Sequence, residues 1–99
     1  SQMAENPETK LTKKIVNALN DIEGCRAEKL HAGPMGMPKL DVIGAVDGKM
    51  LYLEVKTPGN RPTKRQESTM KKWNEEAEIT ATWADNVQDA VKIAQSMKN

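Results

Sequence analysis

The spacing of apolar residues near the N-terminus predicts an amphipathic helix. Five apolar side chains recur there at intervals of three and four residues: Leu11, Ile15, Ala18, Leu19 and Ile22. Asn6 is a suitable N-cap, Pro7 suits the first helical position, and the Glu8 carboxylate favours the positive end of a helix. We therefore expect a helix from about Pro7 to Ile22, ended by Gly24.

The middle of the chain is typical of strands. Cys25–Ala32 is interpreted as a short strand, and a loop rich in glycine and proline follows at residues 33–38. Two further strands are expected at Leu40–Val46 and Met50–Lys56. The Asp47-Gly48 dipeptide between them is a strong indicator of a β-hairpin turn.

The last third returns to helical spacing. Thr63–Glu76 is expected to be a helix, because Thr63 and Gln66 have the spacing of a capping box. Gln66, Met70, Trp73 and Ala77 would share one face, and Met70, Trp73 and Met97 are interpreted as core residues. A strand at Ile79–Ala84 and a last helix, capped by Asp85 with Gln88, complete the order αβββαβα. This order predicts an α/β fold with one mixed sheet.

The hairpin places two acidic residues opposite each other. A two-residue turn at Asp47-Gly48 makes Val46 face Lys49, and stepping outward along both strands brings Asp41 opposite Glu54. Side chains alternate between faces, so Lys56 joins this pair. Two carboxylates about 5 Å apart repel by about 3 kcal/mol at an effective dielectric near 20.

That repulsion must be offset by a proton, a cationic side chain or a divalent metal ion. Mg²⁺ and Mn²⁺ prefer oxygen ligands, and one or two carboxylates suffice when a phosphate completes the coordination. Lys56 could hold or deprotonate a water molecule beside such an ion. The alternative is a solvated carboxylate–lysine network on an exposed sheet face.

Two further polar residues head apolar helix faces. Glu8 precedes the apolar stripe of the first helix, and Gln66 precedes that of the second. Either residue is a component of a site or a local structural group: Glu8 would then stabilise the helix dipole, and Gln66 would only complete the capping box. His31 is interpreted as a packed or exposed histidine more readily than as a catalytic base.

Composition narrows the function classes. The 99 residues suffice for one domain, and 15 Lys and Arg against 14 Asp and Glu exclude a strongly basic or acidic tail. One cysteine and one histidine cannot build a zinc site, so any metal would be bound by oxygen. The lone cysteine, with no long apolar run and no secretory segment, predicts a cytoplasmic protein that is neither secreted nor membrane-bound. Residues 1–6 are expected to be a flexible N-terminus or tag remnant of a single domain, residues 1–99.

Positive charge is concentrated in one segment of this nearly neutral chain. Residues 56–72 contain six cations and one acid; the cations are Lys56, Arg61, Lys64, Arg65, Lys71 and Lys72. Such a segment suits contact with a phosphate backbone, although charge runs are often only solvated surface. A neighbouring pair of carboxylates favours the phosphate interpretation, because a metal site of that kind also binds phosphate.

These residues resemble a known family. The runs Asp41-Val42-Ile43-Gly44 and Leu53-Glu54-Val55-Lys56, followed by Arg61 and Gln66, resemble the PD-(D/E)xK nuclease superfamily, and within it a stand-alone virus-type replication-repair nuclease (VRR-NUC) domain. The resemblance covers nearly the whole chain, from Glu8 to the last helix. One position departs from the family pattern, since Pro38 does not directly precede Asp41. The implied fold is a restriction-endonuclease-like αβββαβα core with a central mixed sheet flanked by helices.

The resemblance implies a role for each residue. Asp41, Glu54 and the Val55 carbonyl would bind Mg²⁺ or Mn²⁺, with Glu8 at a second metal or its water. Lys56 would activate the attacking water, Gln66 would orient Lys56 or the scissile phosphate, and Arg61 would contact DNA. Lys64 and Arg65 of the basic segment are expected to assist in DNA binding.

The expected activity is structure-selective cleavage of branched DNA. Symmetric cutting of a four-way (Holliday) junction by so small a chain requires two copies, so a homodimer is expected. The alternatives are a duplex or flap endonuclease without junction selectivity, a non-catalytic nucleic-acid-binding module on the same fold, and a structural domain with a solvated basic face.

Overall fold

The computed structural model describes residues 6–30 and 41–99. Its elements follow in the order α1 (Pro7–Asn20), β1 (Cys25–Lys29), β2 (Val42–Val46), β3 (Lys49–Val55), α2 (Lys64–Glu76), β4 (Thr80–Ala84) and α3 (Val87–Ser96). The expected order αβββαβα is confirmed, with element ends displaced by a few residues. His31, the predicted loop at 33–38, the end of the first predicted strand and the start of the second lie outside the described residues.

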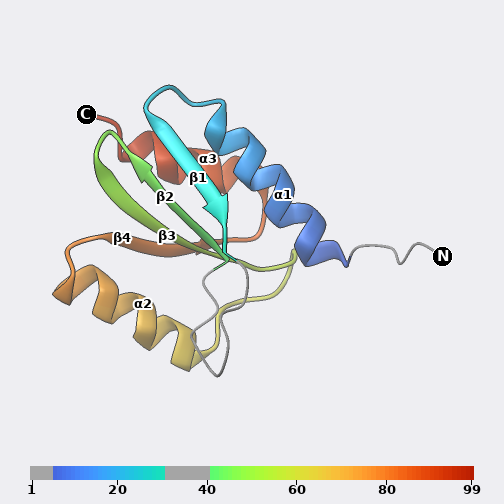
Figure 1. Ribbon diagram of the computed structural model, residues 1–99. Helices are drawn as coiled ribbons and strands as arrows, with labels where there is room; N and C mark the ends of the chain where they lie inside the picture. The colour runs from blue at the N-terminus through green and yellow to red at the C-terminus, as the bar shows by residue number, and fades with distance from the viewer. Residues whose placement is uncertain (1–5, 31–40) are drawn as a thin grey trace.

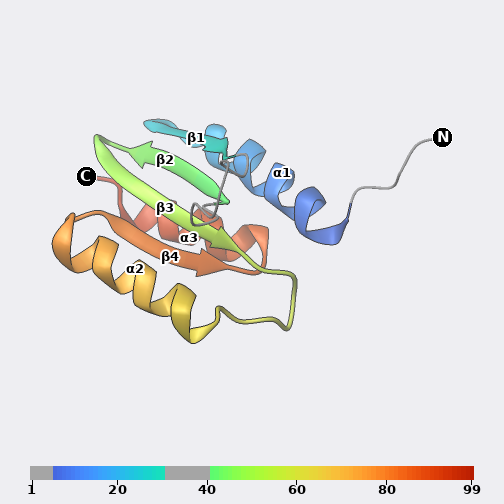
Figure 2. The same ribbon diagram turned by 60° about the horizontal axis from the view of Figure 1, so that its bottom comes forward.

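The four strands form one mixed sheet in the order β1-β2-β3-β4. The first two pairings are antiparallel, whereas β3 and β4 run parallel because α2 connects them as a crossover. Helices α1 and α3 cover one face of the sheet, and α2 lies on the opposite face against β4 (Figures 1 and 2). The predicted α/β class with a mixed sheet is therefore confirmed.

The β2–β3 hairpin has the register expected from its turn. Val46 pairs with Lys49, and Val42 pairs with Leu53. Asp47 and Gly48 have φ angles of 49° and 83°, so both adopt the left-handed conformation that a two-residue hairpin turn requires. Asp41 directly precedes Val42, and Glu54 directly follows Leu53, so the hairpin carries these two residues to the same end of the sheet.

The main core lies between the sheet and the pair α1 and α3. Its fully buried larger side chains are Ile15, Leu19, Val42, Val46, Leu51, Leu53 and Val55. On α1 the buried stripe includes Thr12, where the apolar pattern favoured Leu11, which is only partly buried. Thr12 tolerates burial because its hydroxyl donates to the Glu8 carbonyl at 2.8 Å.

A smaller apolar cluster on the opposite face contains Tyr52, Met70 and Ala81. The prediction that Trp73 belongs to the core is wrong, since 42% of this residue is exposed; Ala77 is exposed as well. Helix α2 packs chiefly on the edge strand β4, so it buries a narrower face than its apolar spacing indicates. Trp73 keeps an edge-to-face contact with Tyr52, with ring centroids 6.2 Å apart.

The helix caps agree with the sequence at α1 and α2 and differ at α3. Asn6 caps α1 as predicted, by accepting from the Thr9 amide at 2.8 Å. Thr63 and Gln66 form the predicted capping box of α2. Helix α3 is capped by Asn86, whose side chain accepts from the Asp89 amide at 2.8 Å, and the prediction of Asp85 as the cap is wrong. The Asn86 side-chain amide also donates to the Asp85 carboxylate at 2.8 Å.

On each edge strand, an asparagine from the adjacent helix forms hydrogen bonds with the backbone of the unpaired edge. Asn20 of α1 accepts from the Ala27 amide of β1 at 2.7 Å and donates to the Ala27 carbonyl at 3.0 Å. Asn74 of α2 bonds the amide and carbonyl of Ala81 in β4 in the same way, at 2.7 and 2.9 Å. An unpaired strand edge is a site for pairing with another chain. Each asparagine occupies one backbone amide and one backbone carbonyl on such an edge.

Replacing Asn74 with alanine is expected to destabilise the protein and expose the β4 edge. Two part-buried hydrogen bonds are lost, which should lower the free energy of unfolding by about 1–3 kcal/mol. Urea denaturation and sedimentation velocity measure the two effects. The exposed Asn17 of α1 provides a matched control, and an Asn74→Ala protein as stable and monodisperse as Asn17→Ala would contradict this role.

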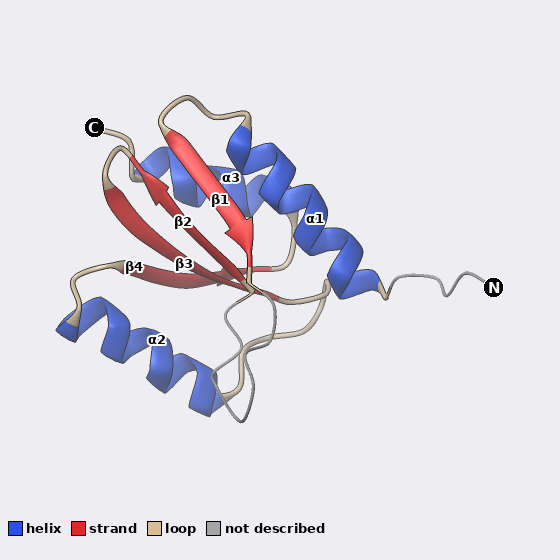
Figure 3. Cartoon of the chain, viewed as in Figure 1, coloured by secondary structure: helices blue, strands red, loops and turns tan. Residues whose placement is uncertain are grey.

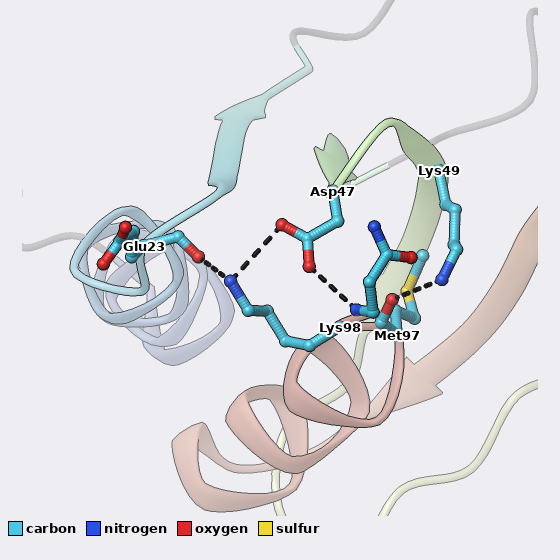
Figure 4. A network of polar contacts seen from close by, with 6 residues as sticks. Glu23, Asp47, Lys49, Met97 and Lys98 are labelled. Carbon is cyan, nitrogen blue, oxygen red and sulfur yellow. Dashed lines mark hydrogen bonds and ion pairs between the residues drawn. The ribbon is translucent and has the colours of Figure 1, made fainter.

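The C-terminal residues connect the β2–β3 hairpin turn to the end of α3 and to the turn between α1 and β1 (Figure 4). The Asp47 carboxylate accepts from the Asn99 amide at 2.9 Å and pairs with Lys98 at 3.3 Å, and Lys98 also donates to the Glu23 carbonyl. Lys49 donates to the Met97 carbonyl at the end of α3. The Asn99 hydrogen bond and the Lys98 charge lower the pKa of Asp47. These contacts hold the turn that determines the hairpin register.

Candidate functional site

Asp41 and Glu54 meet where β2 begins and β3 ends. The Asp41 carboxylate accepts from the Val55 amide at 2.8 Å, so it lies against the backbone directly after Glu54. The Asp41 carbonyl accepts from the Leu30 amide, which holds this residue beside the end of β1. Glu54 is only 4% exposed and belongs to the face covered by α2. The two residues are therefore neighbours in space, as the hairpin register predicts.

Burial and mutual repulsion change the acidity of this pair. Desolvation, followed by the charge of Asp41, raises the pKa of Glu54 to about 7. Desolvation also raises the pKa of Asp41, against the opposing effect of the Val55 hydrogen bond. A hydrogen bond shared by the two carboxyl groups raises the pKa of Glu54 and lowers that of Asp41. Near neutral pH, the pair therefore holds a proton more readily than two separate carboxyl groups would.

Lys56 and Glu8 act on the same two carboxyl groups. The Lys56 charge lowers the pKa of both Asp41 and Glu54, and the Glu8 charge raises both. The Lys56 backbone amide donates to the Ala84 carbonyl at 3.0 Å, whereas its ammonium forms no hydrogen bond or ion pair within residues 6–30 and 41–99. Glu8 lies in the first turn of α1 and is exposed. It does not belong to the buried face of this helix, at the start of which the sequence pattern had placed it.

Gln66 connects the start of α2 to Glu54. Its side-chain oxygen accepts from the Thr63 amide at 2.9 Å, and its side-chain nitrogen donates to Glu54 Oε1 at 2.7 Å. The sequence left open whether Gln66 is a capping residue or a site residue, and the structure shows that it completes the capping box and also contacts Glu54. Its observed partner is Glu54, a contact that the sequence did not predict because α2 is distant from β3 along the chain.

Replacing Gln66 with glutamate is expected to shift the pH dependence of the site without loosening α2. Glutamate can still complete the capping box, but it removes the donor to Glu54 and adds a third negative charge. The pKa of Glu54 should rise further, so any metal-dependent activity should require a higher pH. A pH–rate profile tests this, with Gln95→Glu on the exposed surface of α3 as control. Identical profiles for the two variants would count against it.

The basic residues after β3 lie near β4 and in the first turn of α2. The Arg61 guanidinium lies 5.6 Å from the centroid of the Trp83 ring, and Trp83 is the register partner of Glu54 on β4. Lys64 and Arg65 are exposed in the first turn of α2, the helix on the opposite face of the sheet from α1 and α3 (Figure 3). The structure therefore places Arg61 over Trp83, next to the strand position of Glu54, and leaves Lys64 and Arg65 open to solvent.

The donors at this site suit a small divalent cation. Asp41 and Glu54 offer two carboxylates, the Val55 carbonyl is adjacent in the backbone, and all these donors are oxygen. Over the described part of the chain, no three His, Cys, Asp or Glu side chains gather as a metal-binding group. Two carboxylates remain compatible with Mg²⁺, which keeps several waters and takes further oxygens from a bound phosphate.

Comparisons with protein-family models, curated proteins and solved structures found no match to this chain. The described helices include none long and apolar enough to span a lipid bilayer. The function is therefore inferred from the geometry of Asp41 and Glu54 and from their raised pKa values.

Proposed function

We propose that this protein is a metal-dependent endonuclease that hydrolyses phosphodiester bonds in branched DNA. The observation that carries the proposal is the convergence of Asp41 and Glu54 beside Lys56, with burial and repulsion raising the pKa of Glu54 to about 7. A buried like-charged pair of this kind is costly, and strongly perturbed acids collect at functional sites. A bound Mg²⁺ or Mn²⁺ would relieve the repulsion.

The chain fits such an ion through Asp41, Glu54 and the Val55 carbonyl, with Glu8 near enough to influence both carboxylates electrostatically. When bound, the ion would polarise the scissile phosphate and lower the pKa of a water molecule. Gln66 fixes one oxygen of Glu54 through its hydrogen bond, so the other oxygen keeps a defined direction. The Val55 amide orients Asp41 in the same manner.

Lys56 lies two residues after Glu54, and its positive charge acts on both Asp41 and Glu54. Its ammonium is free of hydrogen bonds and ion pairs within the described residues, so it can hold the attacking water or stabilise charge that develops on the phosphate. Arg61, Lys64 and Arg65 would contact the DNA backbone on both sides of that phosphate. This division of roles is the one that the resemblance to the PD-(D/E)xK superfamily implies, and a restriction-endonuclease-like core belongs to the same proposal.

Branched substrates and a homodimer belong to the same proposal. One chain of 99 residues covers a short length of duplex, and symmetric cleavage of a four-way junction needs two equivalent sites. The test uses purified protein with labelled four-way junction, flap and linear duplex in Mg²⁺ or Mn²⁺, together with light scattering to determine the oligomeric state. Cleavage of the junction by a dimer supports the proposal, whereas equal cutting of linear duplex would remove its structure selectivity.

A second candidate is a nucleic-acid-binding module without catalysis. The observation that favours it is that no group of three metal-ligating side chains forms within the described segments. Such a module would bind the same DNA in a salt-dependent manner and cleave none of it with any divalent ion. Isothermal titration of Mn²⁺ into the protein separates the two candidates further, since only the nuclease needs a metal bound at Asp41 and Glu54.

A further inference from the structure

An open groove of about 390 Å³ runs between α2 and the edge strand β4. Met70, Ala81 and Trp83 provide its apolar lining, while Glu67 and Lys71 are charged residues of α2 at its border. The volume lies within the range of small-molecule sites in proteins. The groove thus offers space for a planar ring of moderate size, with hydrogen-bonding groups at its margin.

The groove begins beside the acidic pair. Trp83 is the register partner of Glu54, and strands paired in a sheet lie about 4.8 Å apart. On α2, Glu67 directly follows Gln66, whose side chain donates to Glu54. A nucleotide whose phosphate lies at Glu54 would therefore have its base within reach of Trp83.

The chemistry of the groove suits an uncharged aromatic ring better than a phosphate. Trp83 offers an aromatic ring for stacking, and the Arg61 guanidinium, which lies over this ring at 5.6 Å from its centroid, adds a planar cation. Glu67 and Glu75 place two carboxylates on the lining, which disfavours a phosphate inside it. Glu67 and Lys71 can accept and donate hydrogen bonds at the edge of a base.

We infer that this groove binds one unpaired nucleobase of the DNA strand that is cut. The inference rests on the proposed function, because it takes the acidic pair as the place of the scissile phosphate. Bases within a duplex are stacked and paired, whereas a branch point offers bases that are extruded at lower cost. The groove would accordingly contribute to the selection of branched DNA.

Tryptophan fluorescence tests the inference on the intact chain. The protein has two tryptophans, so Trp73→Phe leaves Trp83 as the only indole and keeps an aromatic ring against Tyr52. The probes are two flap DNAs in Ca²⁺, one with an unpaired thymine at the branch and one with an abasic residue there. Thymine is expected to quench Trp83 and to bind about tenfold more tightly. Equal quenching and equal affinity, or no DNA binding, would overturn the inference.

Variants of Trp83 separate this role from a structural one. Trp83→Ala should remove the preference for thymine over the abasic residue, and Trp83→Phe should retain part of it. If Trp83→Ala does not fold, the Trp73→Phe titration decides the question alone. The proposed nuclease activity is measured separately in Mg²⁺. Cleavage without a base preference overturns only the role of the groove, whereas a base preference without cleavage overturns the nuclease and leaves the groove as a binding site for an unpaired base.

Discussion

Replacing Lys56 with alanine is expected to lower the rate of metal-dependent DNA cleavage by about a thousandfold. The estimate follows from the usual effect of a residue that transfers a proton or stabilises developing charge, about 10²–10⁴-fold. Lys56 is half-buried at the end of β3, and its ammonium makes no hydrogen bond or ion pair within the described residues, so its removal leaves no buried partner unpaired. Single-turnover cleavage of a labelled four-way junction in Mn²⁺ measures the loss.

Lys92→Ala is the matched control for this prediction. Lys92 is exposed on α3, so the substitution removes the same charge at a position outside the basic segment. Both variants should keep the wild-type circular dichroism spectrum. Comparable cleavage by the Lys56 and Lys92 variants would contradict a catalytic role for Lys56.

Replacing Glu54 with glutamine is expected to make the metal-free protein more stable above pH 7 while abolishing cleavage. Glutamine resembles the protonated form of Glu54: its oxygen can accept from Gln66, and its amide can donate to Asp41. The substitution therefore removes the repulsion and desolvation of a buried charge. We expect the free energy of unfolding at pH 8 to rise by about 2–3 kcal/mol.

The pH dependence of this effect has a defined sign. The pKa of Glu54 is about 7 in the folded protein and near 4.5 when unfolded, so the folded state binds more protons between these values. The stability of the wild-type protein should therefore fall as the pH rises from about 4.5 through about 7. Asp47 does not interfere, because its lowered pKa affects stability only in more acidic solution.

Urea denaturation of the wild type and of Glu54→Gln at pH 5 and pH 8 tests this prediction. The difference between the two proteins should be small at pH 5 and large at pH 8, and titrations common to both cancel. Mn²⁺ should stabilise the wild type at pH 8 and leave the variant unchanged. A variant less stable than the wild type at pH 8 would show that the pair is not repulsive.

The sequence predicted the residues of the site through local geometry. A two-residue turn at Asp47-Gly48 determines which residues of β2 and β3 pair with each other. Asp41 and Glu54 could therefore be placed close together from the sequence alone. The capping box at Thr63 was equally local, since it depends on residues three positions apart. Predictions that depend on one turn of helix or one hairpin succeed because few conformations satisfy them.

Other features could not be read in this way. Trp73 has the spacing of a core residue, yet it is exposed because α2 packs on the edge of the sheet. Asn20 and Asn74 give no distinctive signal in the sequence, although each closes a strand edge. Their partners are chosen by the orientation of a helix against a strand, which no local pattern encodes.

The amino-acid sequence by itself determined the order of helices and strands, the hairpin register and the facing of Asp41 and Glu54. Only the tertiary structure decided that Gln66 donates to Glu54, that the charge of Glu8 on α1 acts on Asp41 and Glu54, and that Trp83 lines a groove next to Glu54. The physical reason is the range of the forces. Turns and caps depend on bonds between near neighbours in the chain, whereas burial and pKa shifts depend on which distant segments exclude water together.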